Sequence, residues 1–227
     1  ELNFDVLLVG RFLKDSSLLE RPYAIKRFHL LFKKGFLFYA FYNIRLFVFL
    51  LFQKVDVLHA NDLDTLFANW LISRIRKKEI MYDSHEYFTA VPEIQHRPLV
   101  KKTWEKIEKS IFPKLQHVFT VNQSIADIYK NKYNVEVKVL RNLPFKNIIE
   151  KTQTKQSLKL PLNKSIIILQ GAGINIDRGA EELLEAIAIS DNLFLCIVGS
   201  GDVIEILKKR SCSEDLRNKV LFTGKLN

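Results

Sequence analysis

The chain has 227 residues, of which 48% are hydrophobic, so it is long and apolar enough to bury the cores of two small domains. Its net charge of +10 can be explained by an anionic nucleotide substrate, an anionic membrane surface or nucleic acid. The two cysteines lack the spacing of a metal site or of a disulfide framework, which excludes a disulfide-stapled module and favours a reducing compartment.

Two strands are predicted near the start of the chain. Residues 4–9 are apolar and end in a turn at Gly10, and residues 23–30 alternate apolar and basic side chains, as an edge or half-buried strand does. The sequence begins at Glu1 close to the first strand pattern, and its last strand pattern lies at its end. We therefore expect a fragment of a longer protein.

Residues 35–52 form the most apolar stretch of the chain and predict a long helix. Its length approaches that of a membrane span, but Asn43 and Arg45 near its middle argue against spanning. We expect a helix buried between a sheet and its neighbours. The alternative is a helix that contacts an anionic membrane, which the basic residues Lys33 and Lys34 before it favour.

The next segment predicts a strand–helix–strand unit. Residues 55–62 and 80–88 are each a short apolar strand that runs into polar residues, and residues 63–78 between them have apolar side chains at helical spacing. Such a crossover sets the two strands parallel, so both polar clusters emerge at the carboxyl edge of one sheet, where open α/β folds bind ligands. The residues expected to line one crevice there are His59, Asp62, Asp83, His85 and Glu86.

His85 is the strongest candidate for chemistry in this group. Asp83 and Glu86 lie beside it in sequence, where carboxylates can fix the tautomer of an imidazole or raise its pKa. A single histidine after a strand is, as an alternative, often structural. Because no pair among His59, Asp62, His85 and Glu86 has metalloenzyme spacing, we expect no metal site.

The chain then completes one domain, passes through a linker and begins another. Basic residues are spread along predicted helices and loops without interleaved aromatic residues, so we expect no nucleic-acid partner. The remaining predicted elements are a helix over 99–115 broken by Pro113, a strand over 118–121, a helix over 125–132 capped at 122–124, a strand over 135–140, a linker over 146–163, a strand over 165–170, a glycine loop over 171–179, a helix over 180–189, a strand over 193–198, a helix over 203–210 and a strand over 220–223.

The glycine loop predicts an anion site. A strand, a glycine-rich turn and a helix N-terminus present backbone N–H groups to a phosphate, and Arg178 supplies a countercharge. A dinucleotide is disfavoured, because Ile176 stands where a third glycine is needed and Gly199 where an acid would hold the ribose. The alternative is that these glycines only permit tight turns.

Several stretches together resemble a family 4 glycosyltransferase of the GT-B architecture. They are VLHANDLDT at 57–65, YDSHE at 82–86, VFTVNQSIAD at 118–127, VLRNLP at 139–144, residues 166–186 as the first βα unit of a donor domain, and LCIVGSG at 195–201. Two features bear on the donor loop: Ala172 stands where the family often has an arginine, and Arg178 stands where it has a lysine.

This resemblance implies an α/β, GT-B-like fold with two Rossmann-like parallel-sheet domains and a cleft between them, both truncated. The domains would be an acceptor domain over 1–145, a linker over 146–163 and the start of a nucleotide-sugar donor domain over 164–227. The catalytic residues it implies are His85, Asp62 and Glu86, and the donor-binding residues are Gly171, Gly173, Arg178, Gly179, Gly199, Gly201 and Gly224.

The function implied is retaining transfer of a sugar from a nucleotide sugar to a sugar or lipid-linked acceptor, in cell-surface polysaccharide or glycolipid synthesis. We expect no cofactor and no metal, a cytoplasmic location with contact to the inner face of the membrane, and no activity from the fragment alone. The alternatives are a GT-B-like sugar-nucleotide epimerase and a non-catalytic α/β binding module.

Overall fold

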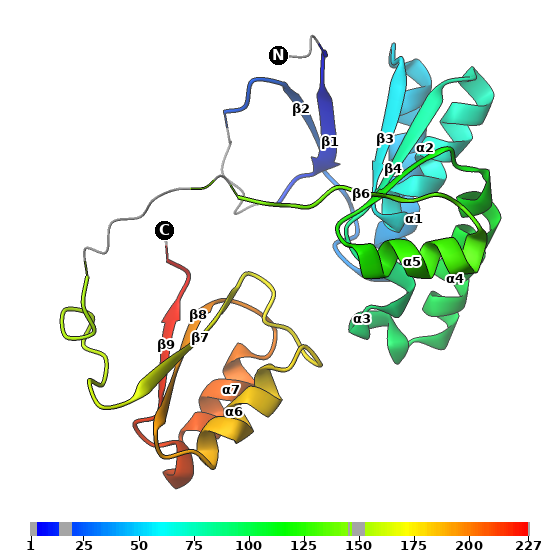
Figure 1. Cartoon of the computed structure of the whole chain (residues 1–227). Helices are drawn as coiled ribbons and strands as arrows, with labels where there is room; N and C mark the ends of the chain where they lie inside the picture. The colour runs from blue at the N-terminus through cyan, green and yellow to red at the C-terminus, as the bar shows by residue number, and fades with distance from the viewer. Residues whose placement is uncertain (1–3, 14–19, 145, 147–152, 227) are drawn as a thin grey trace. The chain divides into compact units, whose positions relative to one another are not determined.

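The computed structural model describes residues 4–13, 20–144, 146 and 153–226 (Figure 1). The chain divides into two compact units, residues 1–142 (unit 1) and residues 143–227 (unit 2). Of the predicted linker, residues 147–152 lie outside the described residues, and residues 153–163 form turns and coil. Each unit combines helices with sheets whose described strands all pair in parallel, as the sequence predicts.

Unit 1 begins with a two-stranded parallel sheet of β1 (Leu7–Arg11) and β2 (Ala24–Phe28). The strand predicted over 4–9 is shifted toward the C-terminus, because Gly10 and Arg11 pair with β2 instead of forming a turn. Phe28 is buried and its ring packs against the rings of Tyr42 and Phe49 on the following helix. One face of this small sheet is therefore held by α1 (Gly35–Phe52).

The helix α1 has the predicted bounds but is not the buried core helix that we expected. Of its residues only Tyr42, Leu46 and Leu50 are buried. It is the one helix in the described part of the chain that is long and apolar enough to cross a membrane. Its apolar pattern predicted the helix correctly, but could not show how little of it the rest of unit 1 covers.

A four-stranded parallel sheet follows, in the order β3–β4–β5–β6. Its strands are β3 (Val57–Asn61), β4 (Glu79–Ser84), β5 (His117–Thr120) and β6 (Lys138–Val139). The helix α2 (Leu63–Arg76) connects β3 to β4, which confirms the predicted strand–helix–strand unit. The strand predicted over 135–140 is reduced to two residues, since only Lys138 and Val139 pair with β5.

The helices of unit 1 start and stop at recognisable signals. Asn122 caps α5 (Gln123–Tyr133), its side-chain oxygen accepting the Ile125 N–H at 2.9 Å. Pro113 lies in a 3₁₀ turn, so the helix predicted over 99–115 ends at Ile111. The other helical elements are η1 (Phe88–Ala90), α3 (Pro92–Gln95), α4 (Pro98–Ile111) and η2 (Phe112–Lys114).

Aromatic side chains fill the core between the sheet and α5. The Phe112 ring stacks on the rings of Tyr129 and Tyr133, with centroids 4.4 Å and 4.8 Å apart, and meets the Tyr82 ring edge-on. Tyr82, Phe112 and Tyr129 have no exposed surface. In this layer the Tyr129 hydroxyl lies 3.1 Å from the Ser84 hydroxyl, whereas the Tyr82 hydroxyl is buried without a hydrogen-bond partner among the described residues.

Unit 2 is a three-stranded parallel sheet, β7 (Ser165–Gly171), β8 (Leu193–Gly199) and β9 (Val220–Gly224), with helices packed on it. The helices are α6 (Ala180–Ala188), α7 (Ile204–Ser211) and the 3₁₀ turn η3 (Glu214–Leu216). Their core residues include Leu184, Ile187 and Leu207, which cluster with Leu195 and Ile197 of β8.

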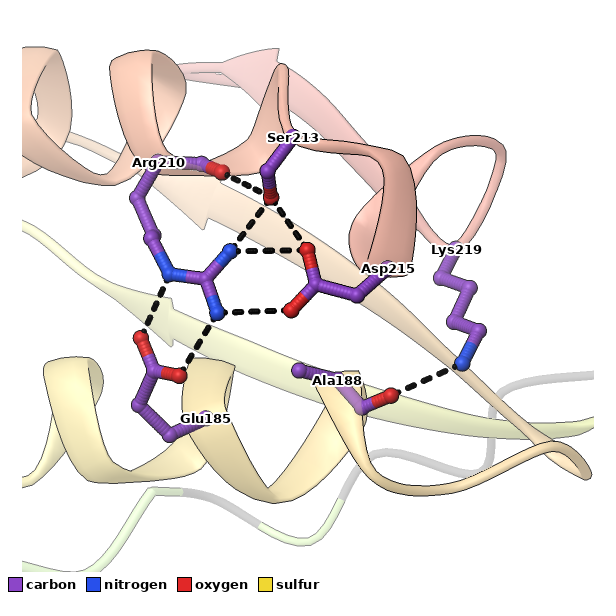
Figure 2. A network of polar contacts seen from close by, with 6 residues as sticks. All are labelled: Glu185, Ala188, Arg210, Ser213, Asp215 and Lys219. Atoms are coloured by element: carbon purple, nitrogen blue, oxygen red, sulfur yellow. Dashed lines mark hydrogen bonds and ion pairs between the residues drawn. The ribbon is translucent and has the colours of Figure 1, made fainter.

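A polar network ties the helices of unit 2 together. Figure 2 shows Arg210 between the carboxylates of Glu185 on α6 and Asp215 on η3, with two bonds of 2.7 Å to Glu185 and bonds of 2.8 Å and 3.0 Å to Asp215. Lys219 donates to the Ala188 carbonyl at the end of α6 (3.0 Å). The Arg210 guanidinium lowers the pKa of the Asp215 carboxyl.

Candidate active site

The carboxyl ends of β3 and β4 carry the polar residues that the sequence singled out. These strands run parallel with Asn61 opposite Asp83, so the residues that follow them leave the sheet at the same edge. Two carboxylates and two histidines meet there within unit 1. We call this group, His59, Asp62, Asp83 and His85, the polar edge.

Asp62 joins the two strand ends through its backbone and its side chain. Its N–H donates to the Asp83 carbonyl (2.8 Å), and its carboxylate accepts the backbone N–H of His85 (2.8 Å). Its backbone has φ 58° and ψ 169°, a combination that is rare outside glycine and that stores strain. Residues in such conformations cluster at active sites, so this strand end is a candidate for function.

Asp83 places its carboxylate between two imidazoles. Its Oδ2 lies 3.1 Å from Nε2 of His85 and 3.8 Å from Nε2 of His59. The Asp83 side chain is 14% exposed, whereas those of His85 and His59 are 42% and 51% exposed. The carboxylate therefore hydrogen-bonds the His85 ring and lies near the His59 ring, and both rings are accessible to a bound molecule.

Glu86 lies in the same turn, half-buried, and its backbone carbonyl accepts the Ser84 hydroxyl at 2.8 Å. Its negative charge contributes to the raised pKa of Tyr39, after burial and the charge of Asp64. Glu86 is thus in the same turn as His85, and its charge acts on Tyr39 of α1.

Sequence reasoning missed a carboxylate next to this edge. Asp64, in the first turn of α2, has a pKa raised to about 6, because burial and the charge of Asp62 both disfavour its ionised form. Asp64 in turn raises the pKa of Tyr42 to about 12, after burial of the phenol. The Asp-Leu-Asp pattern at 62–64 was the available signal, since a second carboxylate three residues after the end of β3 stays near the same edge.

The glycine loop of unit 2 is tied to the loop after β8. Ser200 N–H donates to the Gly171 carbonyl (3.0 Å), and Ile174 N–H donates to the Ser200 carbonyl (3.1 Å). Ile176 N–H donates to the Asp202 carboxylate (3.0 Å). Among the residues that the structure describes, the N–H groups of Ala172 and Gly173 have no acceptor, so these two can serve an anion.

Four of the six donor-site glycines fall into two groups by what surrounds them. A Cβ on Gly199 would lie 1.8 Å from the Gly171 carbonyl oxygen, and one on Gly201 would lie 1.8 Å from the Ile174 carbonyl oxygen. These two glycines therefore allow close packing of one loop on the other. Around Gly179 and Gly224 a Cβ would meet nothing within 4 Å, and both have positive φ, which favours glycine.

The start of α6 is less favourable to an anion than its sequence pattern suggested. Glu181 and Glu182 lie in its first turn, where their charge offsets the positive end of the helix. Any diphosphate bound there would depend on Arg178 and the loop N–H groups more than on the helix. In the described part of the chain, no group of three or more acidic, histidine or cysteine side chains is arranged to hold a metal ion.

Comparisons with known proteins agree with this architecture. Residues 1–142 match the family model described as Glycosyltransferase Family 4. A search of curated proteins found no match. Among solved structures, the chain is similar to sucrose-phosphate synthase from Thermosynechococcus elongatus, with a TM-score of 0.69 and 16% identity over 99% of this chain and 61% of that one.

Two further structures show the same likeness. HepE of Anabaena in complex with UDP-glucose has a TM-score of 0.57 and 16% identity over 84% of this chain and 52% of that one. The lipopolysaccharide outer core galactosyltransferase WaaB has a TM-score of 0.51 and 12% identity, over 91% of this chain and 54% of that one. The likeness shows a Rossmann-like GT-B fold, and the chain spans between 52% and 61% of these structures.

Proposed function

The chain belongs to glycosyltransferase family 4, and from that premise we propose that the complete protein transfers a sugar, with retention of configuration, from a nucleotide sugar to an acceptor. The observation that carries the proposal is the polar edge, where parallel strands end: two accessible histidines lie beside the partly buried carboxylate of Asp83, and Asp62 holds the backbone of His85. The family match covers the part of the chain that holds this edge.

His85 is assigned the central role at the polar edge. Its imidazole is accessible and oriented by Asp83, so it can hydrogen-bond a hydroxyl of the transferred sugar. Asp62 fixes the backbone of His85, and Glu86 borders the same turn. Asp62 and Glu86 would thus keep the imidazole in place and complete the polar wall around the reacting sugar.

The donor would bind unit 2 through its diphosphate. When the bond between the sugar and the diphosphate breaks, negative charge develops on the leaving oxygen, and fixed donors around it lower the barrier. Arg178 and the N–H groups of Ala172 and Gly173 are the donors that we assign to this charge, and we propose that transfer proceeds with them and without a metal. The structures of HepE with UDP and with UDP-glucose support UDP as the first nucleotide to test.

Calorimetry with UDP and GDP tests the donor assignment. Arg178→Ala should weaken binding to the complete protein by roughly 1.5–3 kcal/mol, the range for a hydrogen bond to a charged group. Arg217→Ala is the matched control, because it removes the same charge from an exposed position on unit 2 outside the glycine loop. Equal affinity of the Arg178 variant and the parent protein would remove this assignment.

We also propose that the protein works at the cytoplasmic face of an anionic membrane, on an acceptor used for surface polysaccharide or glycolipid. The support is a stripe of exposed apolar residues along one side of α1. Its members recur every three or four residues and are 37–62% exposed: Leu37, Phe41, Ile44, Val48 and Leu51. Lys33 and Lys34 precede the helix and can meet acidic headgroups.

The two polar residues within α1 do not interrupt the stripe. The Asn43 amide donates to the carbonyls of Tyr39 and Asp64, at 3.0 Å and 2.8 Å, and Arg45 donates to the His29 carbonyl (2.6 Å). Asn43 is bonded within unit 1, and the exposed Arg45 is not one of the stripe positions, so the stripe presents an apolar surface that can enter the headgroup region while the helix lies flat.

Vesicle sedimentation tests the membrane proposal. The protein should bind vesicles containing phosphatidylserine, weakly bind neutral vesicles, and release at high salt. Replacing Ile44 and Val48 with Gln should abolish binding, whereas the same change at Ile75, an exposed apolar residue of α2, should not. Binding that survives the α1 substitutions would contradict the proposal.

A further inference from the structure

The turn that carries His85 and Glu86 is held at its first residue by α5. Ser84 has no exposed surface, and its hydroxyl donates to the Glu86 carbonyl at 2.8 Å. The Ser84 Oγ also lies 3.1 Å from the Tyr129 hydroxyl. Because the one Ser84 proton is used on Glu86, the Tyr129 hydroxyl is the donor in this second bond.

The same helix holds the turn at its last residue. Lys132 donates to the Tyr87 hydroxyl at 3.0 Å and lies over the Tyr87 ring, 5.2 Å from its centroid. The Tyr87 ring packs edge-on against the ring of Tyr129, with centroids 5.4 Å apart. Tyr129 and Lys132 are three residues apart, so one face of α5 contacts both ends of the turn.

Lys132 is itself anchored to a buried carboxylate. Glu108 of α4 has no exposed surface, and its Oε1 accepts Lys132 Nζ at 2.7 Å and the Tyr133 hydroxyl at 2.5 Å. Its Oε2 is buried without a hydrogen-bond donor among the described residues. A buried carboxylate depends on its partners, so Glu108 keeps Lys132 in place.

We propose that Tyr129 and Lys132 are positioning residues for His85: they fix the turn over residues 84–87, so that the His85 N–H stays on Asp62 and its imidazole stays on Asp83. The inference rests on the proposed function only for what the positioned histidine does. The geometry of the turn stands apart from it, because every contact lies within unit 1. Burial and the charge of Glu108 raise the pKa of Tyr129, which keeps its hydroxyl a donor at neutral pH.

Hydrogen exchange measured residue by residue by NMR tests the positioning directly. Tyr129→Phe should accelerate exchange of the His85 amide by roughly 2- to 10-fold, as expected for the loss of one neutral hydrogen bond. Tyr42→Phe is the control: it removes the same group from α1 of unit 1, where the hydroxyl donates to the Val9 carbonyl (3.5 Å) and not to the turn. Equal effects of the two variants on His85, or none from Tyr129→Phe, would overturn the proposal.

Lys132 needs a paired variant, because Lys132→Met alone leaves Glu108 buried without its cation and can prevent folding. In a Glu108→Gln background, Lys132→Met removes the bond to Tyr87 without a buried unpaired charge. The His85 amide should exchange faster in this double variant than in Glu108→Gln alone. If the His85 amide exchanges equally fast in the double variant and in Glu108→Gln, Lys132 is not a positioning residue for His85.

Kinetics then separate positioning from folding. In the complete protein, Tyr129→Phe should lower kcat for sugar transfer by about the factor seen in exchange, with the KM for the nucleotide sugar unchanged, because the donor loop lies in unit 2. If Tyr129→Phe accelerates exchange of the His85 amide but leaves kcat unchanged, Tyr129 has no role in the reaction. Absence of sugar transfer by the parent protein would refute the proposed function. The exchange measurement would still show whether Tyr129 fixes the turn that carries His85.

Discussion

Asp62 offers the sharpest test of how the polar edge is built, because its backbone strain and its hydrogen bond act in opposite directions. Asp62→Ala removes the carboxylate that accepts the His85 N–H, a charged hydrogen bond of roughly 1.5–3 kcal/mol. Since His85 is exposed and water can replace part of this bond, we expect the lower end, about 1.5 kcal/mol.

Asp62→Gly removes the same bond but relieves the strain of a residue at φ 58° and ψ 169°, which is worth roughly 1–3 kcal/mol. The glycine variant should therefore be more stable than the alanine variant by that amount and close to the parent protein. Asp62→Asn keeps an acceptor of the same shape without the charge, so its stability should lie between those of the alanine variant and the parent.

Urea unfolding followed by tryptophan fluorescence reports on this region alone, because both tryptophans, Trp70 and Trp104, belong to unit 1. The order expected for the free energy of unfolding is parent and glycine above asparagine, with alanine lowest. Equal stabilities of the alanine and glycine variants would show that the backbone at Asp62 is not strained. An alanine variant as stable as the parent would refute the bond to His85.

Three further predictions concern stability. The pKa of Asp64 is raised from 3.8 to about 6, so the free energy of unfolding of unit 1 should fall by up to about 3 kcal/mol as pH rises from about 4 to about 6. Asp64→Asn should flatten this pH dependence in unfolding followed by fluorescence. Gly199→Ala should destabilise unit 2 by roughly 3 kcal/mol or more, because the new Cβ would overlap the Gly171 carbonyl. Gly173→Ala, the control, should cost less than about 1 kcal/mol. Hydrogen exchange of β7 and β8 measures both effects. Because the pKa of Asp215 is lowered in the folded protein, its ion pair with Arg210 stabilises unit 2 above the ordinary carboxyl pKa, and this stabilisation is lost in acid. Arg210→Met should therefore lower the stability of unit 2 at pH 7 and make its unfolding by acid, followed by circular dichroism, less steep.

The sequence predicted the parts of the fold that local physics determines. The alternation of apolar strand and amphipathic helix over residues 55–84 specified a parallel unit, and Asn122 marked the start of α5. Because parallel strands deliver their carboxyl ends to one edge, it also predicted that His59, Asp62, Asp83 and His85 are neighbours.

What the sequence could not provide depends on contacts between distant residues. The bond between Ser84 and Tyr129 joins residues 45 positions apart, and no periodicity announces it. The exposure of α1 depends on what covers a helix, which its own apolar pattern does not contain. Gly199 and Gly201 looked like ligand-facing glycines, and only the structure shows that a neighbouring loop occupies the space beside them.

The central claim is that the polar edge serves glycosyl transfer, and His85→Ala tests it most directly. The measurement is the release of nucleoside diphosphate and the formation of glycosylated acceptor from UDP-glucose, UDP-galactose or GDP-mannose and a sugar or lipid-linked acceptor by the complete protein, with His117→Ala as control. His117 begins β5, at the opposite edge of the same sheet. We predict that His85→Ala lowers kcat/KM by about 10²-fold without changing the unfolding midpoint, while His117→Ala leaves kcat/KM unchanged. Normal turnover by a folded His85→Ala protein, or an epimerised nucleotide sugar as the product, would contradict it.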